Sequence, residues 1–376
     1  MTSGAVECLV TGGAGFLGRN IIQTLLQKHP DWRITVLDLA SPPEEAIQQQ
    51  QQHWQRTVVG WLHADITSAD SVQAAFQNYR PDIVFHCAGI VPARDLRYSR
   101  DSKQWEKVKA INYHGTVNVL QATLETGCRK FVYTSSCTAV IDDLDHDYYN
   151  MNESIPLGRA TLHYGKSKAM AEQYVLSPEY AAQGLKACAL RPCTIIGPGD
   201  IAVISLIHDL ITKGETYFVV GDGNNLYDFM YIDNAVQAHI LAAENLLSTQ
   251  TAAGQAFFIS NQEPVYFWDF FSAIWAQFGH VPRFRVFVPL WLAWMVAFVL
   301  EIVTFVTGAA QTLDTGSVKD AVRTHFSDNT KAIEILGYRP TVGLAEGLRM
   351  WCDDYRAYLD HHKQKPQEQQ KKQHLT

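Results

Sequence analysis

The first two hundred residues alternate between short apolar runs and longer segments in which apolar residues recur with helical spacing. The short runs, which predict strands, lie at residues 8–10, 33–37, 57–62, 83–89, 130–136 and 187–191. The segments with helical spacing lie at residues 17–27, 105–125 and 164–172. Strands that alternate with helices in this way predict a doubly wound parallel sheet, an α/β fold of the Rossmann type.

The pattern changes to short mixed elements after Asp200. We therefore expect a nucleotide-binding domain of residues 1–200 and a smaller C-terminal substrate lobe of residues 201–228 and 262–360. Residues 229–261 are expected to return to the sheet, because they contain a helix start and the apolar run 255–259. The tail 361–376 is rich in Gln and Lys and is expected to be disordered.

Three spaced glycines follow the first predicted strand, in the segment Thr11-Gly12-Gly13-Ala14-Gly15-Phe16-Leu17-Gly18. Gly12 permits a tight turn, Gly15 lets a pyrophosphate approach the backbone, and Gly18 lets a helix pack on the strand. The helix entered through Phe16 and Leu17 would direct its free amides and the positive end of its dipole at the phosphates. This segment predicts a dinucleotide-binding site.

An acidic residue at the end of the second strand indicates which dinucleotide binds. Asp38 follows the run 33–37 and stands twenty positions beyond Gly18. A carboxylate at this place can accept hydrogen bonds from both ribose hydroxyls, and its charge would repel a 2′-phosphate. The predicted cofactor is therefore NAD rather than NADP.

Two further strand ends are candidates for cofactor contacts, because ligands of open parallel sheets bind beyond the carboxyl ends of the strands. Asp65 and Ile66 follow the strand at 57–62 and are expected at the adenine. Ala88 and Gly89 follow the strand at 83–87 and are expected beside the ribose. Helix capping is the alternative role for Asp65.

Three residues have the chemistry of an alcohol dehydrogenase. Tyr164 and Lys168 stand four positions apart on a predicted helix, hence on one face, and Ser136 ends the strand before them. A lysine ammonium, with the charge of an oxidised nicotinamide, would lower the pKa of the phenol so that it can take a proton from an alcohol. Ser136 could hold the substrate oxygen against Tyr164, while Ser135 is expected to be a structural neighbour.

These motifs resemble those of the extended short-chain dehydrogenases/reductases: TGxxGxxG at Thr11 to Gly18, Ser136 ahead of the YxxxK pair, and the strand end Arg191-Pro192. Within that superfamily the chain is most similar to the 3β-hydroxysteroid dehydrogenase family, especially the decarboxylating sterol-4α-carboxylate 3-dehydrogenases of fungi. The similarity lies in residues 132–136, 190–200, 221–229 and 256–261. It implies that Asn112 assists the proton relay and that Pro192 contacts the cofactor.

The resemblance implies NAD-dependent oxidation of the 3β-hydroxyl of a sterol or triterpenoid, with loss of a 4α-carboxylate. A steroid or terpenoid alcohol dehydrogenase, with or without isomerase activity, is an alternative, and a non-enzymatic NAD-binding sensor is another. A sugar-nucleotide epimerase would need cations for its diphosphate substrate. Lys213 is the only lysine or arginine in residues 201–229. The region is otherwise mainly apolar and aromatic, which favours a hydrophobic substrate.

The segment 286–306 is the strongest membrane signal in the chain. Residues 286–300 carry no charge, Glu301 follows, and Trp291 and Trp294 suit an interfacial position. The uncharged stretch is shorter than the roughly twenty residues that span a bilayer. We expect membrane association through this segment, with a buried lid helix over the substrate pocket as the alternative. The resemblance implies the cytosolic side of the endoplasmic reticulum membrane.

Composition excludes several other classes of function. The formal charge of −7 argues against nucleic acid as a partner. The seven cysteines form no CxxC pair and are expected to be reduced core thiols, and no cluster of His and Cys has the spacing of a zinc site. We therefore expect no metal. A homodimer is compatible with the sequence.

Overall fold

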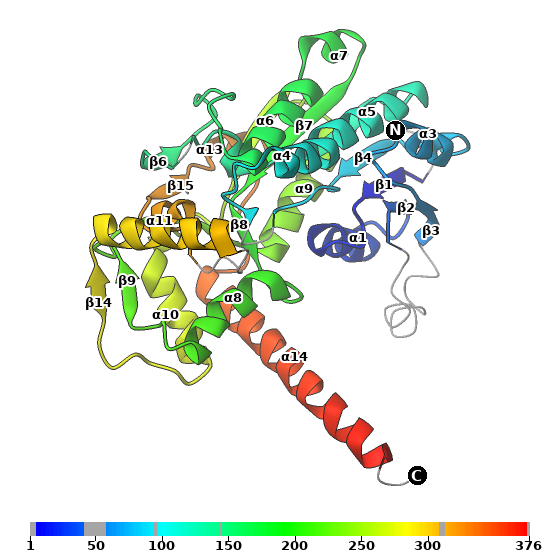
Figure 1. Ribbon diagram of the computed structural model, residues 1–376. Coiled ribbons are helices and arrows are strands. Elements are labelled where there is room, and N and C mark those ends of the chain that lie inside the picture. The colour runs from blue at the N-terminus through cyan, green and yellow to red at the C-terminus, as the bar shows by residue number, and fades with distance from the viewer. Residues whose placement is uncertain (1–4, 41–57, 93–95, 143, 308–312, 374–376) are drawn as a thin grey trace.

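Seven parallel strands form the central sheet of the protein (Figure 1). The computed structural model describes residues 5–40, 58–92, 96–142, 144–307 and 313–373. The sheet has the order β12-β7-β5-β4-β1-β2-β3. Its strands are β1 (Glu7–Thr11), β2 (Arg33–Asp38), β3 (Val58–His63), β4 (Ile83–His86), β5 (Lys130–Thr134), β7 (Lys186–Pro192) and β12 (Gln255–Ile259). The predicted doubly wound sheet is confirmed.

Helices cover both faces of this sheet because its strands are apolar on both sides. On β1, Cys8 and Val10 join a core with α1 (Phe16–Lys28) and α9 (Ile232–Leu247). Leu9, which points to the other face, joins a second core with α3, α5 and α6. The remaining helices of this region are α3 (Ala69–Phe76), α4 (Ser102–Lys109), α5 (Gly115–Glu125), α6 (His163–Val175) and α7 (Pro178–Ala182).

The chain order of the strands reverses between β1 and β4. From β1 the chain moves outward through β2 and β3, and it then returns to add β4, β5 and β7 on the other side. Ligands of doubly wound sheets bind at such a reversal, outside the carboxyl ends of the strands. The glycine turn after β1 and the segment after β4 therefore lie at the ligand-binding edge.

The predicted helix at 105–125 consists of three consecutive elements. They are α4, a π-helical turn η2 (Ala110–His114), and α5. Single π-turns inside helices occur frequently at functional sites. A short 3₁₀-helix, η3 (Cys137–Ala139), follows β5.

The C-terminal part contains small sheets and further helices. A four-stranded sheet has the order β13-β10-β15-β6, and the pairs β11-β8 and β14-β9 are separate. These strands are β6 (Tyr148–Met151), β8 (Thr194–Ile196), β9 (Phe218–Val220), β10 (Leu226–Tyr227), β11 (Phe229–Tyr231), β13 (Val265–Tyr266), β14 (Val286–Val288) and β15 (His325–Ser327). The helices are α8 (Ile201–Thr212), α10 (Phe267–Gln277), α11 (Leu290–Thr307), α12 (Thr315–Asp320), α13 (Thr330–Leu336) and α14 (Leu344–Gln373). Because β6 pairs with β15, this part includes a segment that precedes residue 200.

Helix α14 extends away from the rest of the molecule (Figure 1). Its start is held by Leu348, Trp351 and Tyr355, which recur at helical spacing and are buried against α8 and α10. The helix then continues to Gln373, so the prediction of a disordered tail from residue 361 was wrong for 361–373. Gln, Lys and Glu are good helix formers, and they prolong a helix that packing has already nucleated.

Candidate active site

The turn between β1 and α1 has the geometry that a pyrophosphate needs. A Cβ on Gly12, whose φ is +69°, would lie 2.7 Å from Ala88 Cα. A Cβ on Gly18 would lie 2.3 Å from the Gly12 carbonyl oxygen, which explains the close packing of the helix on the turn. Gly15 begins α1 without any side-chain cap, so the amides of Phe16 and Leu17 are not satisfied by a capping side chain.

Gly15 leaves this turn open on one side. Within 4 Å, a Cβ there would meet only the Gly12 carbonyl oxygen, at 3.1 Å. Sequence reasoning did not single out Gly13, where a Cβ would lie 2.5 Å from Val36 Cγ1. The second of the paired glycines therefore serves packing on the sheet, while Gly15 leaves room for a ligand.

Asp38 lies beside this turn at the end of β2. Its Oδ2 accepts a hydrogen bond from the Ala14 amide at 2.9 Å, and its Oδ1 accepts one from the Ala40 amide at 2.9 Å. The fold therefore places a carboxylate next to the open side of the glycine turn. The ribose-binding role of Asp38 stays a prediction.

Asp65, which follows β3, makes mainly local contacts. Its Oδ1 accepts hydrogen bonds from both the amide and the hydroxyl of Thr67, each at 2.8 Å. Ser68, not Asp65, caps α3, so the alternative of a helix cap was wrong. Ile66 packs against Gly115 at the start of α5. Cofactor contacts by Asp65 and Ile66 stay predictions.

The segment after β4 brings the turn and the reactive side chains together. Ala88 lies over Gly12, and a Cβ on the following Gly89 would lie 3.1 Å from Asn112 Oδ1 and 3.3 Å from Lys168 Nζ. Only a residue without a side chain fits between these two groups. Ala88 and Gly89 thus lie between the glycine turn and Lys168, and their contact with a ribose stays a prediction.

Tyr164 and Ser136 lie near each other at the end of β5, where Ser136 acts to lower the pKa of the Tyr164 phenol. Ser136 Oγ also accepts hydrogen bonds from the amide and the hydroxyl of Thr138, at 3.2 and 2.9 Å. Since the serine oxygen already accepts two hydrogen bonds, its own hydrogen is free to be donated to the phenol oxygen. This geometry allows Ser136 to stabilise a phenolate.

Lys168 is buried one helical turn from Tyr164, and its Nζ donates to the Thr134 carbonyl at 2.8 Å. Burial lowers the pKa of Lys168 to about 8. Burial also raises the pKa of Tyr164 to about 12, against the lowering effects of Ser136 and of Arg97. The expected lowering by Lys168 is therefore not found in the protein alone, because burial dominates and the lysine is directed at the backbone of β5.

Ser135, the other candidate serine, has the structural role that was expected for it. Its hydroxyl donates to Glu172 Oε2 at 2.6 Å, and Arg191 Nη2 donates to Glu172 Oε1 at 2.6 Å. Glu172 and Arg191 are both buried. This ion pair connects α6, β5 and β7, and it holds Ser136 and the helix of Tyr164 in register. Pro192, next to Arg191, ends β7, and its predicted cofactor contact is untested.

Asn112 lies in the π-helical turn with its side chain fully engaged. Its Nδ2 donates to the Ile90 carbonyl and to Ser167 Oγ, each at 3.0 Å, and its Oδ1 accepts from the Ile90 amide at 2.8 Å. Its carbonyl accepts from Thr116 Oγ1, which also pairs with the buried His86. These contacts position the segment after β4 against α6, while the predicted relay role stays a prediction.

Arg97 is a candidate that sequence reasoning missed. Its charge acts to lower the pKa of Tyr164, and Tyr98, Tyr227 and Asp320 are near enough to raise the pKa of Arg97. The tertiary structure joins these groups from segments far apart in the chain. The available signal was an arginine between a strand end and the following helix, a position at the ligand-binding edge of the sheet.

Helix α11 leaves most of its apolar surface uncovered. Among the residues of α11 whose side chains the structure describes, Ala293 and Ala297 alone are buried, against Val318 of α12. The exposed side chains of α11, each at least 40% accessible, include Trp291, Trp294, Met295, Val296, Phe298, Val299 and Ile302, and Phe287 of the preceding β14 is exposed as well. The alternative of a buried lid helix is therefore wrong. Within the described ranges, no helix meets the length and hydropathy criteria for crossing a bilayer.

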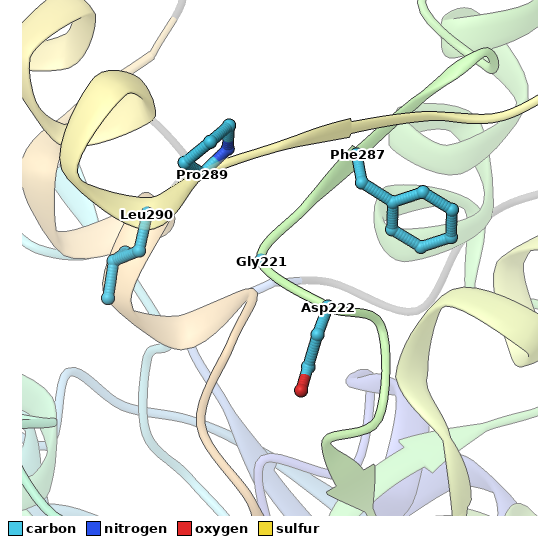
Figure 2. A pocket seen from close by; sticks show the side chains of 5 residues that line it. All are labelled: Gly221, Asp222, Phe287, Pro289 and Leu290. Atoms are coloured by element: carbon cyan, nitrogen blue, oxygen red, sulfur yellow. The ribbon is translucent and has the colours of Figure 1, made fainter.

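Two shallow depressions, both largely open to solvent, adjoin this helix. One of about 600 Å³ is lined by Leu290, Trp291, Trp294, Met295, Lys319 and Arg323. The other, of about 570 Å³, is shown in Figure 2, where Phe287, Pro289 and Leu290 border the loop of Gly221 and Asp222.

The residues that the structure describes contain no group of three His, Cys, Asp or Glu side chains able to hold a metal ion. All seven cysteines are free.

Comparison with known proteins gives one family. The model of the 3-beta hydroxysteroid dehydrogenase/isomerase family matches residues 9–290. The decarboxylating sterol-4-alpha-carboxylate 3-dehydrogenase of Schizosaccharomyces pombe is 34% identical over 348 residues, which cover 91% of this chain and 96% of that protein. The enzyme of the same name from Saccharomyces cerevisiae is 30% identical, over 92% of this chain and 97% of its own.

Solved structures agree on the fold. UDP-glucose 4-epimerase of Thermotoga maritima has a TM-score of 0.69 at 22% identity, covering 94% of this chain and all of its own. UDP-glucuronic acid 4-epimerase of Bacillus cereus, in complex with UDP-glucuronic acid and NAD, has a TM-score of 0.69 at 21% identity, with the same coverage. At these identities the likeness concerns the fold alone.

Proposed function

The chain belongs to the 3-beta hydroxysteroid dehydrogenase/isomerase family, and from that membership we propose that it oxidises the 3β-hydroxyl of a sterol or triterpenoid with NAD and removes a 4α-carboxylate. The observation that carries the proposal is the proximity of Ser136 to Tyr164, with the buried Lys168 one helical turn away. Relatives named for this reaction match the chain over nearly its whole length.

The residues present fit NAD. The uncapped start of α1 and the open side of Gly15 suit a pyrophosphate, and the carboxylate of Asp38 suits a ribose with free hydroxyls. NADP would bring a phosphate against the same carboxylate. When bound, NAD would accept the hydride from the alcohol carbon.

Tyr164 is the proposed base. It would take the hydroxyl proton as the hydride leaves the carbinol carbon, with Ser136 donating a hydrogen bond to the reacting oxygen or to the phenolate. Lys168 contributes positive charge beneath this pair. Because the pKa of Tyr164 is about 12 in the protein alone, the charge of the oxidised cofactor has to favour the phenolate.

The 3-ketone product has its carboxylate on the adjacent carbon, which makes it a β-keto acid. The bond to the carboxylate breaks, carbon dioxide leaves, and the electron pair enters an enolate on the former ketone. Tyr164 and Ser136 can stabilise the enolate oxygen, and a proton then adds to the ring carbon.

The test incubates the purified protein with NAD and a 4α-carboxy-3β-hydroxysterol while NADH and the sterol products are followed by mass spectrometry. The proposal expects NADH, carbon dioxide and a decarboxylated 3-ketone. NADH with a retained carboxyl group would instead support a steroid or terpenoid alcohol dehydrogenase. NAD binding without turnover of any sterol alcohol would support the sensor.

We further propose that α11 and β14 lie on the cytosolic surface of the endoplasmic reticulum membrane. The exposed apolar residues of α11 support this placement, and a water-insoluble sterol would be collected from a bilayer. Free thiols on all seven cysteines are consistent with a reducing compartment.

Liposome flotation without detergent tests the membrane proposal. Each large apolar side chain contributes about 1.5–3 kcal/mol when it leaves water. Combined Trp291→Ser and Phe298→Ser changes should therefore weaken binding about a hundredfold or more. Tyr149→Ser, which removes an exposed aromatic ring on β6, is the control. Wild-type protein that stays with the soluble fraction would contradict the placement.

A further inference from the structure

Arg97 is a partly buried cation whose guanidinium has no ion-pair partner within 4 Å among the described residues. Its nearest printed contact is with the ring of Tyr98, 5.9 Å from the guanidinium carbon to the ring centroid. An unpaired charge that is withdrawn from water is costly to the fold. Such a group is a candidate for binding an anion from outside the chain.

The carboxylate of Asp320, which is close enough to influence Arg97, is already occupied. Its Oδ2 accepts a short hydrogen bond of 2.5 Å from Tyr98 Oη, and its Oδ1 lies 3.8 Å from His325 Nε2. Tyr98 is in turn held by α12, because Gly316 leaves room for its ring. Asp320 therefore balances charge in this region without engaging the guanidinium of Arg97.

Arg97 also lies close enough to Tyr164 for its charge to favour the phenolate. In the proposed substrate, the carboxyl carbon is bonded to the carbon next to the carbinol carbon. A hydroxyl that reaches Tyr164 thus brings the carboxylate into the region where Arg97 and Tyr164 interact. A guanidinium can hold a carboxylate by two parallel hydrogen bonds, which a lysine cannot do.

We propose that Arg97 binds the 4-carboxylate of the sterol and is the residue that selects carboxylated over uncharged substrates. This inference rests on the proposed function and adds a subsite to it. Oxidation consumes the hydroxyl while the carboxylate stays on Arg97 until its carbon–carbon bond breaks. Arg97 is therefore a specificity residue, distinct from the proton-transferring Tyr164.

The test compares a 4α-carboxy-3β-hydroxysterol with its methyl ester, which keeps the shape and removes the charge. Binding is measured by calorimetry with NAD present and with Tyr164→Phe in every protein, so that no turnover occurs. The parent should prefer the acid over the ester by about ten- to a hundredfold, the range expected for a charge-assisted hydrogen-bonded pair. Arg97→Met should abolish this preference, and Arg97→Lys should retain part of it.

Arg100→Met is the matched control, because Arg100 lies in the same connection and is exposed. It should keep the preference of the parent. A merely structural role of Arg97 would weaken acid and ester equally, and an unchanged ratio in Arg97→Met would overturn the proposal.

Turnover measurements distinguish a failure of the Arg97 subsite from a failure of the proposed function. If Tyr164-containing protein oxidises and decarboxylates the acid, and Arg97→Met does so with an unchanged KM, the proposed function stands and the Arg97 subsite fails. If neither the acid nor the ester is oxidised or bound by the protein, the proposed function fails and the subsite fails with it.

Discussion

Because the amino group of Lys168 is buried, the free energy of unfolding should depend on pH in a way that can be measured. Its side chain is 5% exposed, and burial lowers its pKa from the ordinary value of 10.5 to about 8. Below pH 8 the ammonium is charged in both folded and unfolded chains. Between about pH 8 and 10.5 the unfolded chain holds the proton while the folded protein has lost it.

The sign of the effect follows from proton binding. Where the unfolded state binds more protons, the free energy of unfolding rises with pH. A pKa difference of about 2.5 at about 1.4 kcal/mol per pH unit corresponds to about 3 kcal/mol. Keeping Lys168 charged at pH 7 therefore costs about 3 kcal/mol of stability, and most of this amount should be recovered by pH 10.

Lys168→Met removes the group and with it this gain. Urea unfolding without cofactor, at pH 7 and pH 10, gives the free energy of unfolding of each protein. The difference between wild type and Lys168→Met should shift in favour of wild type by about 2–3 kcal/mol over this interval. Lys166→Met, which removes an exposed lysine from the same helix, is the matched control. A difference that stays constant with pH would show that burial does not lower the pKa of Lys168, because a lysine with free access to solvent adds no such pH dependence to the free energy of unfolding.

Three further outcomes follow from the site. Tyr164→Phe should lower kcat about 10²- to 10⁴-fold, the usual range for a lost acid-base group, and leave the Kd of NAD in fluorescence titrations unchanged; retained turnover would remove Tyr164 from the mechanism. Asp38→Ser should weaken NAD binding about ten- to a hundredfold and improve the ratio of NADP to NAD turnover, since it removes a carboxylate that also holds the Ala14 amide; an unchanged ratio would contradict its role. Arg191→Met should lower the free energy of unfolding by about 3–5 kcal/mol, because it leaves Glu172 buried and unpaired, and the double variant with Glu172→Gln should recover part of the loss in the same urea assay.

Local pattern was enough to predict the nucleotide-binding edge of the fold. Buried parallel strands are apolar on both faces, and helices show apolar residues with a period of 3.6. The alternation of these two patterns therefore predicted the sheet. The glycines of the turn could be identified because Gly12 and Gly18 have no room for a Cβ. Local pattern could not show why Ser135 has a structural role and Ser136 does not, because the buried partner of Ser135 is Glu172, which lies 37 positions away.

The errors have a common cause, because each concerns a quantity that depends on neighbours from elsewhere in the chain. The tail is helical beyond residue 361 because its start packs on α8 and α10. The phenol of Tyr164 has a raised pKa because burial, which spacing does not report, outweighs the charges near it. Asp65 does not cap α3, since Ser68 is better placed for its first turn.

The amino-acid sequence by itself determined the sheet, the glycine turn with its acidic partner, and the spacing of Tyr164 and Lys168, because these features depend on residues within one or two adjacent elements. Only the tertiary structure decided the surroundings of Tyr164. Arg97 comes from the connection after β4, Tyr227 from β10 and Asp320 from α12, and they meet because the C-terminal part folds back over the edge of the sheet. Charge interactions depend on distance in space and not along the chain, so no periodicity could have predicted that the charge of Arg97 acts on the phenol of Tyr164.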